Sequence, residues 1–177
     1  MKKIIIIISI LMLITVINKE EYYIIPKEAI RLRIIANSDT IKDQNIKNKI
    51  RKNIDKEINK ILETSTIDES RKKINENIDD IKKIIEKVLK EEKTDYKYSI
   101  NFGSNYFPEK IYKNVKYEAG NYESLVVILG AGNGDNWWCV LFPPICVIEE
   151  NETKNIEYKT YIREIMEKYI KINWKIS

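Results

Sequence analysis

Two cysteines and a few pairs of carboxylates are the residue types in this sequence that could support chemistry, because the chain contains no histidine. Without imidazole, a Ser-His-Asp or Cys-His nucleophile relay and a histidine metal site are excluded. A site made of two cysteines and carboxylates would be unusual for zinc, whose tetrahedral sites are mostly Cys and His. We therefore expect no metal and no cofactor.

Two acidic pairs have the residue types of a glycosidase or lytic mechanism: Asp39 with Asp43, and Glu118 with Glu123. Such a mechanism depends on the separation of the two carboxyl groups, which a sequence does not supply. Asp39 and Asp43 have a simpler use at a helix N-terminus, where negative charge opposes the helix dipole. We expect no catalytic residue and no enzyme. A cell-wall or envelope hydrolase that uses acidic residues is the alternative hypothesis.

The cysteines, Cys139 and Cys146, are separated by six residues that include Pro143 and Pro144. In an exported protein such a pair can form a disulfide across the proline bend, which would contribute on the order of 2–3 kcal/mol. Two buried thiols are the alternative. Redox catalysis is disfavoured because the spacing is not Cys-x-x-Cys and no strand-to-helix turn would activate a thiolate.

A glycine-rich segment, with Gly130, Gly132 and Gly134, resembles a dinucleotide- or phosphate-binding loop. A phosphate-binding glycine loop follows a strand and opens a helix. This segment leads instead into a second strand-like run, Trp137 to Phe142, and it lacks Gly-Lys-Ser/Thr. It therefore predicts a hairpin loop in which glycines take positive φ.

Two adjacent tryptophans, Trp137 and Trp138, open that second run. Neighbouring residues of a strand face opposite sides, so one ring can enter the core while the other emerges. An outward Trp beside Pro143 and Pro144 would be an anchor for a partner, since Trp is frequent at interface hot spots. The alternative is that helices cover both rings.

The N-terminal segment is typical of an export signal. Two lysines precede an apolar run from Ile4 to Ile17, and polar residues follow it. As a helix the run spans about 21 Å, less than the roughly 30 Å hydrocarbon core, which favours a cleaved signal peptide over residues 1–21. No Ala-x-Ala-like cleavage site is present, so an uncleaved membrane anchor stays open. We expect this segment to enter the membrane at least transiently, and residues 22–177 to form a single exported domain.

The charge of the chain does not favour a nucleic-acid partner. Lys and Arg number 31 against 27 Asp and Glu, a net charge of +4, and without Lys2 and Lys3 this falls to +2. The cations are mostly lysines interleaved with acidic residues, whereas nucleic-acid-binding surfaces carry a large positive excess on one face.

The spacing of apolar residues predicts the elements that position these side chains. Alternation from Ile30 to Ala36 indicates a half-buried strand that ends at a cluster of cap formers, Asn37 to Thr40. Thr40 then begins a first amphipathic helix whose apolar stripe runs from Ile41 to Ile61. Thr66, followed by Glu69 in a capping-box pattern, begins a second helix.

Alternation predicts three further strands, at Tyr96 to Phe102, Tyr122 to Leu129 and Trp137 to Phe142, and a closing helix from Ile156 to Ile170. Residues 107–116 have no clear period and are expected to form a loop. This order predicts an α+β fold, with a mainly antiparallel sheet of about four strands covered by two long helices and a C-terminal helix.

Two blocks of this sequence resemble the motifs of the stage II sporulation protein R family. The first is RLRIIANSD, from Arg31 to Asp39, which continues to Asp43-Gln44 and Lys47. The second runs from Phe107-Pro108 through the glycine-rich segment into NWWCVLFPP, from Asn136 to Pro144. This last string is long and compositionally rare. The resemblance covers about residues 29–148.

The resemblance implies a signal of endospore formation that is not an enzyme. Proteins of this family are made in the forespore and exported into the space between the forespore and mother-cell membranes. They act there on a membrane-embedded aspartic-type protease of the mother cell, which then removes the pro-sequence of sigma-E. We expect two surfaces to bind this partner, one at the turn and one on the last strand and its end: Asn37, Ser38, Asp39; and Asn136, Trp137, Trp138, Pro143, Pro144.

Overall fold

The structure, a computed structural model, describes residues 22–62, 66–112, 115–145 and 158–169. Its elements follow in the order β1 (Tyr23–Ile24), β2 (Ile30–Ile35), α2 (Ile41–Leu62), α3 (Ile67–Glu76), α4 (Ile78–Glu91), β3 (Tyr98–Phe107), β4 (Lys110–Tyr112), β5 (Val115–Tyr117), β6 (Gly120–Leu129), β7 (Asn136–Phe142) and α5 (Tyr158–Tyr169). The predicted α+β class is confirmed. The predicted signal peptide or anchor, residues 1–21, lies outside the described residues. Of the helices in the described part of the chain, none has both the length and the apolar composition needed to cross a membrane.

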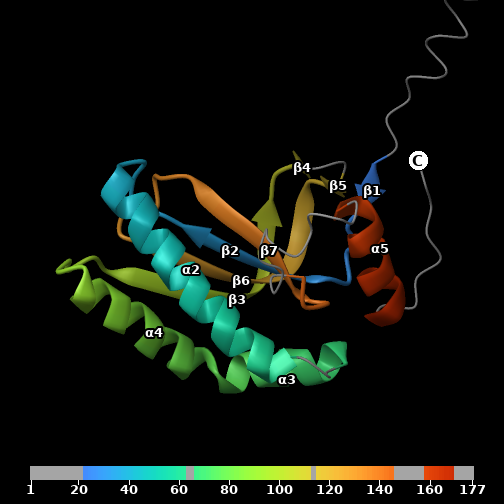
Figure 1. Cartoon of the computed structure of the whole chain (residues 1–177), viewed down its shortest axis with the longest axis horizontal. Helices are drawn as coiled ribbons and strands as arrows, with labels where there is room; N and C mark the ends of the chain where they lie inside the picture. Colours follow the sequence, from blue (N-terminus) through green and yellow to red (C-terminus); the bar gives the residue numbers. More distant parts are fainter. Residues whose placement is uncertain (1–21, 63–65, 113–114, 146–157, 170–177) are drawn as a thin grey trace, which may run out of the picture.

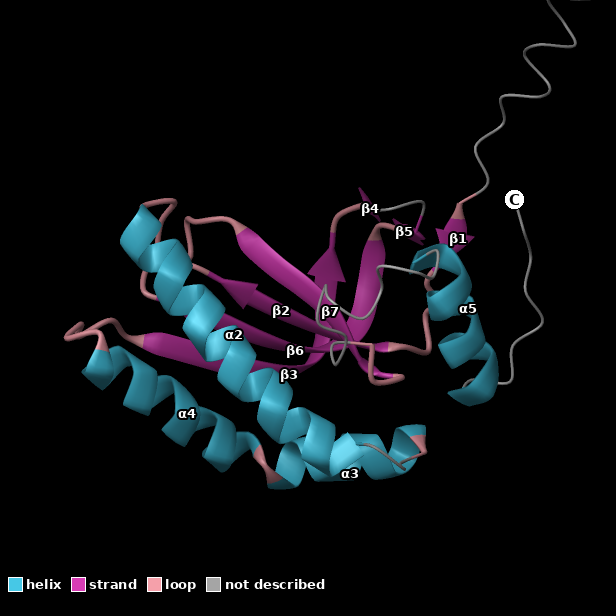
Figure 2. Ribbon diagram, viewed as in Figure 1, coloured by secondary structure: helices cyan, strands magenta, loops and turns pink. Residues whose placement is uncertain are grey.

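The main sheet has four strands in the order β3-β6-β2-β7. β6 runs antiparallel to β3 and parallel to β2, and β7 runs antiparallel to β2. The sheet is therefore mainly antiparallel, as predicted, with one parallel pair at its centre. Figure 2 shows these strands side by side, with α2 in front of them, α3 and α4 below, and α5 apart on the right.

The segment between β6 and β7 is not a hairpin loop, so that prediction is wrong. β2 lies between these two strands, and residues 130–135 cross over its C-terminal end before β7 begins. The alternation of two strands is the same whether they pair with each other or with a third strand between them, so the sequence pattern did not distinguish the cases. The expected positive φ is present at Gly130 and Gly132.

Helices α2 and α3 begin where the sequence predicts. Thr66 forms a complete capping box with Glu69, and the Thr40 hydroxyl accepts a hydrogen bond from the backbone nitrogen of Asp43. The second predicted helix, however, is two helices, α3 and α4, which meet at Asn77. The Asn77 side chain donates to the carbonyl oxygen of Lys73 at 2.8 Å, an interaction that competes with regular helical hydrogen bonding.

One hydrophobic core joins α2, α3 and α4 to the main sheet (Figure 1). Ile30, Leu32 and Ile34 of β2 face it, and α2 adds a buried row of isoleucines at steps of four residues. Ile41 was expected in the same apolar stripe, but it is 82% exposed because it starts the helix on the outward side.

A second core lies on the other face of the main sheet, at one end. The small sheet, in the order β1-β5-β4, and helix α5 enclose Val115, Val140, Ile162 and Met166 there. The loop prediction for residues 107–116 is therefore wrong, because β4 is three residues long, too short to show a period. The strand predicted to stop at Gly103 also continues, since β3 pairs with β6 as far as Phe107.

Candidate partner-binding site

The turn after β2 and the loop after β6 bind each other at one end of the main sheet. The Asn37 side-chain oxygen accepts a hydrogen bond from the backbone nitrogen of Ala131 at 2.9 Å, and an Asp39 carboxylate oxygen accepts one from the backbone nitrogen of Asp135 at 2.6 Å. Backbone hydrogen bonds from residues 133 and 134 to residues 37 and 36 continue the contact. We call this unit, residues 37–39 with residues 130–135, the clasp.

The glycines of the clasp allow this close approach. A Cβ atom at Gly130 would lie 2.1 Å from the side-chain oxygen of Asn37, and one at Gly134 would lie 2.3 Å from the carbonyl oxygen of Ser38. Neither distance is possible for a real side chain, and Gly130 also has φ of +56°. The glycine-rich segment is therefore used to seat the turn, which explains its composition without a phosphate ligand.

Asp43, in the first turn of α2, holds the turn of the clasp from below. Its carboxylate accepts hydrogen bonds from Ser38 Oγ at 2.6 Å, Asn37 Nδ2 at 2.8 Å and the Tyr96 hydroxyl at 3.0 Å. Burial raises the pKa of Asp43, but the bonds from Ser38, Asn37, Tyr96 and Thr40 outweigh it, so the pKa lies below its ordinary value. Asp43 is therefore a structural carboxylate that stays ionised.

Two more residues of the first motif join α2 to the clasp. Gln44 Nε2 donates to the Ser38 carbonyl oxygen at 3.0 Å and to Asp39 Oδ1 at 3.2 Å. Lys47 Nζ donates to the carbonyl oxygen of Asp135 at 3.0 Å. Burial lowers the pKa of Lys47, against the opposing effect of Asp135 and Asp39. Sequence reasoning gave these two residues no role, although their place in the motif was the available signal.

Three of the four carboxylates considered for hydrolysis have hydrogen-bond donors in the structure: those of Asp39, Asp43 and Glu123. A general acid needs a raised pKa, whereas Asp43 has a lowered one. Glu123 of the other pair accepts from Arg71 Nε at 2.8 Å, in an ion pair that joins α3 to β6. These contacts give the carboxylates a positioning use, and none of them favours the hydrolase hypothesis.

The two tryptophans lie on opposite faces of β7, as strand alternation predicts. Trp137 packs against the helix-covered core, with the Arg51 guanidinium carbon 4.7 Å from its ring centroid. Trp138 lies on the other face, where its ring centroid is 5.2 Å from that of Phe107. Helices α2, α3 and α4 therefore do not cover both rings.

Arg31 lies on the same face of the main sheet as Trp138, inside a cage of aromatic rings. Its guanidinium carbon is 3.3 Å from the ring centroid of Tyr122 and 5.5 Å from those of Phe107 and Tyr117. Arg31 is 1% exposed, so the strand predicted to be half-buried is buried on both faces at this position, because the aromatic rings and the small sheet cover it. Burial lowers the pKa of Arg31, with the neighbouring Tyr122, Tyr117 and Glu118 opposing the effect, but guanidinium remains charged in proteins.

The residues predicted to bind a partner do not form one surface. Asn136 pairs with Ile35 beside the clasp, whereas Pro143 and Pro144 follow the other end of the seven-residue β7, about 20 Å away at the usual rise per residue. Pro143 is buried and Pro144 is partly exposed. Cys139 lies partly buried on β7, but Cys146 is outside the described residues, so the disulfide stays a prediction.

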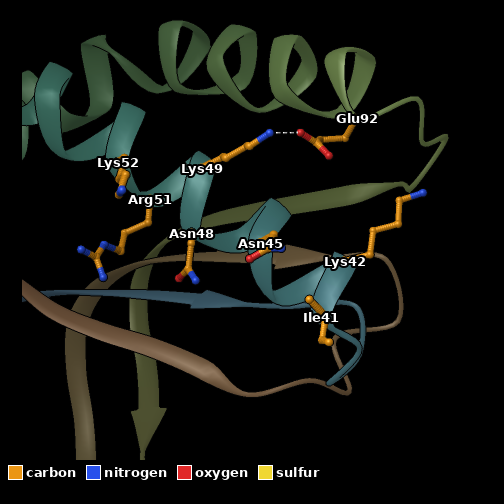
Figure 3. A pocket seen from close by; sticks show the side chains of 8 residues that line it. All are labelled: Ile41, Lys42, Asn45, Asn48, Lys49, Arg51, Lys52 and Glu92. Atoms are coloured by element: carbon orange, nitrogen blue, oxygen red, sulfur yellow. Dashed lines mark hydrogen bonds and ion pairs between the residues drawn. The ribbon is translucent and has the colours of Figure 1, made fainter.

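A separate hollow of about 720 Å³ lies on the outward side of α2, which the sequence analysis did not single out (Figure 3). It is lined by Ile41, Lys42, Asn45, Asn48, Lys49, Arg51, Lys52 and Glu92. Lys49 and Glu92 form an ion pair across it. In the sequence, the hollow is indicated only by Ile41, which lies five residues before Ile46, whereas the isoleucines that follow recur mostly at steps of four.

The fold and site define a class of α+β protein in which two distant sequence motifs close one end of a sheet. A family model described as stage II sporulation protein R matches residues 26–152. The stage II sporulation protein R of Bacillus subtilis (strain 168) is 41% identical over 133 residues, which are 75% of this chain and 59% of that relative. This chain belongs to the stage II sporulation protein R family, a family of sporulation proteins, and it spans about three fifths of this relative. No solved structure matches the chain.

Proposed function

We propose that this protein is an exported sporulation signal that activates a membrane-embedded aspartic-type protease of the mother cell, which leads to processing of pro-sigma-E. The family match over residues 26–152 is the observation that carries this proposal. The protein acts in the space between the forespore and mother-cell membranes, after residues 1–21 direct its export. It is a ligand of the protease and not an enzyme itself.

Activation by a ligand requires that it bind the active arrangement of the protease more tightly than the inactive one. A rigid surface serves this purpose because little conformational entropy is lost on binding. The clasp gives such rigidity, since Asn37 and Asp39 are joined to backbone atoms of the loop at residues 130–135. The neighbouring β7 carries the partly exposed Trp138 on the face of the main sheet opposite to α2, α3 and α4.

The proposal is tested by reconstitution in a non-sporulating bacterial host that carries the protease and pro-sigma-E. We expect the full chain to cause processing and a chain without residues 1–21 to cause none. An unrelated cleavable export signal fused to residue 22 is the control, and it should restore processing. A full chain that is exported and folded but gives no processing would contradict the proposal.

A further inference from the structure

Arg33, Lys110 and Trp138 gather on the face of the main sheet opposite to α2. The Trp138 ring centroid lies 5.2 Å from Lys110 Nζ and 5.8 Å from the Arg33 guanidinium carbon. The Phe107 ring lies beneath, 5.9 Å from Arg33 and 5.2 Å from Trp138 by centroid. We call Arg33, Lys110 and Trp138 the cationic cluster. Arg33 and Trp138 are partly exposed and Lys110 is exposed, so solvent reaches it.

The cationic cluster lacks anionic partners of its own. Within the described residues, no carboxylate forms an ion pair with Arg33 or Lys110, and burial is the sole cause of the lowered pKa of Arg33. Arg33 Nε and Trp138 Nε1 are buried without a hydrogen-bond acceptor in the same part of the chain. Buried donors in folded proteins are normally paired, so these two mark the cluster as short of acceptors. The terminal guanidinium nitrogens of Arg33 are not among the buried unpaired atoms and Lys110 is exposed, so these are the groups that an outside acceptor can reach.

Arg31 adds a third positive charge, buried beside the two of the cluster. It is two residues before Arg33 on the same face of β2, and it shares the Phe107 ring with Arg33. None of its three side-chain nitrogens has a hydrogen-bond partner among the described residues, although it is 1% exposed. A charge held in a low-dielectric aromatic cage extends its field to the surface, because little water screens it there.

We propose that the cationic cluster binds the carboxylate side chains of an acidic peptide segment in a protein partner. The planar guanidinium of Arg33 offers parallel donors that match a carboxylate, the exposed Lys110 supplies a second positive charge, and the ring of Trp138 between them supplies an apolar wall. That this partner is the protease rests on the proposed function. The binding of carboxylates by the cationic cluster does not depend on it.

The lysine-rich hollow on α2 is a useful contrast. Lys49 there already has a carboxylate partner in Glu92, and no aromatic residue is among the described residues that line the hollow. The cationic cluster differs because Arg33 rests on Phe107, Lys110 lies over Trp138, and neither has a carboxylate partner among the described residues. Lys52 of the hollow therefore serves as the matched control position for loss of one exposed positive charge.

The binding test uses the full chain labelled with ¹⁵N and a tetraglutamate peptide, with tetraglutamine as the uncharged control. We expect the indole N–H signal of Trp138, assigned with a Trp138→Phe variant, and the Nε–H signal of Arg33 to shift with tetraglutamate alone. Arg33→Gln and Lys110→Gln should each weaken binding by about tenfold. Lys52→Gln should bind as the unaltered chain does.

Three outcomes would overturn the inference: no shift of Trp138 at millimolar tetraglutamate, equal shifts with tetraglutamine, or equal weakening by Lys52→Gln. The failure of this inference is distinguishable from failure of the proposed function. If the cluster does not bind carboxylates, the unaltered chain still causes processing of pro-sigma-E in the reconstituted host. If the proposed function is wrong, tetraglutamate still binds but no processing occurs.

Discussion

Asp39 accepts a hydrogen bond at 2.6 Å from the backbone nitrogen of Asp135, which lies 96 residues further along the chain. This bond joins the first family motif to the second across the end of β2. The residues expected to form a partner-binding turn therefore also hold the fold together. An effect of substitution in this turn on signalling has to be separated from an effect on stability.

A substitution at Asn37 measures how much the clasp contributes to stability. Asn37→Ala removes the acceptor for the backbone nitrogen of the exposed Ala131 and one donor to the buried carboxylate of Asp43. We expect the free energy of unfolding in urea to fall by about 2 kcal/mol. Asn45→Ala, on the exposed side of α2, is the control and should change it by less than about 0.5 kcal/mol. Equal effects of the two substitutions would contradict the structural role of the clasp.

The glycines of the clasp give a second prediction. Gly134→Ala places a Cβ atom 2.3 Å from the backbone oxygen of Ser38, which is not the end of a flexible side chain. The turn and loop must separate, so we expect a loss of about 2 kcal/mol or more in urea unfolding. Gly103→Ala is matched to it, because its new Cβ would meet nothing closer than 3.8 Å. A Gly134→Ala protein as stable as Gly103→Ala would show that the clasp does not close as described.

Asp55 on α2 makes stability depend on pH. Burial raises the pKa of Asp55 to about 7, against the opposing charge of Arg51, whose Nε lies 3.6 Å from its carboxylate. The unfolded state releases this proton near pH 4, so between about pH 4 and pH 7 the folded state binds more protons than the unfolded state. Stability therefore falls as pH rises through this window.

Asp55→Asn removes that pH dependence. We expect the variant to be more stable than the unaltered chain at pH 8 by roughly 1–2 kcal/mol, measured by urea unfolding at several pH values. Asp79→Asn, at an exposed site paired with Lys82, should leave the slope between pH 5 and about pH 7 unchanged. An unchanged slope in Asp55→Asn would contradict a buried carboxyl at this position.

A substitution at Arg31 distinguishes the contribution of this side chain to stability from the contribution of its charge to binding. A buried charge without acceptors is costly, and an apolar residue of similar volume often replaces it without loss. We expect Arg31→Met to keep or raise the free energy of unfolding, by about 1 kcal/mol, while tetraglutamate binds more weakly. A loss of more than about 2 kcal/mol would show that cation–π contacts with Tyr122 outweigh the desolvation of Arg31.

Local signals were enough to predict much of the fold. Thr40 and Thr66 mark helix starts because their hydroxyls cap nearby backbone nitrogens, an interaction within three residues. Strand alternation likewise placed Trp137 and Trp138 on opposite faces. The insertion of β2 between β6 and β7 was not predictable, because pairing partners depend on contacts about a hundred residues apart, which periodicity does not encode.

The site was predictable in part. Asn37, Asp39 and the glycine-rich segment were singled out, but their mutual contact is a tertiary one that no local pattern contains. Arg31 and Arg33 alternate with apolar residues, which is the usual pattern of a solvated face. The small sheet and the aromatic cage cover Arg31, and they arise from residues far along the chain.

The most direct measurement is pro-sigma-E processing in the reconstituted host, with the unaltered chain, the double variant Arg33→Gln and Lys110→Gln, and Lys52→Gln exported to equal levels. We predict that the unaltered chain and Lys52→Gln cause processing. The double variant should cause little, although its thermal unfolding matches that of Lys52→Gln. An unaltered chain that is exported and folded beside the protease, yet leaves pro-sigma-E intact, would contradict the account.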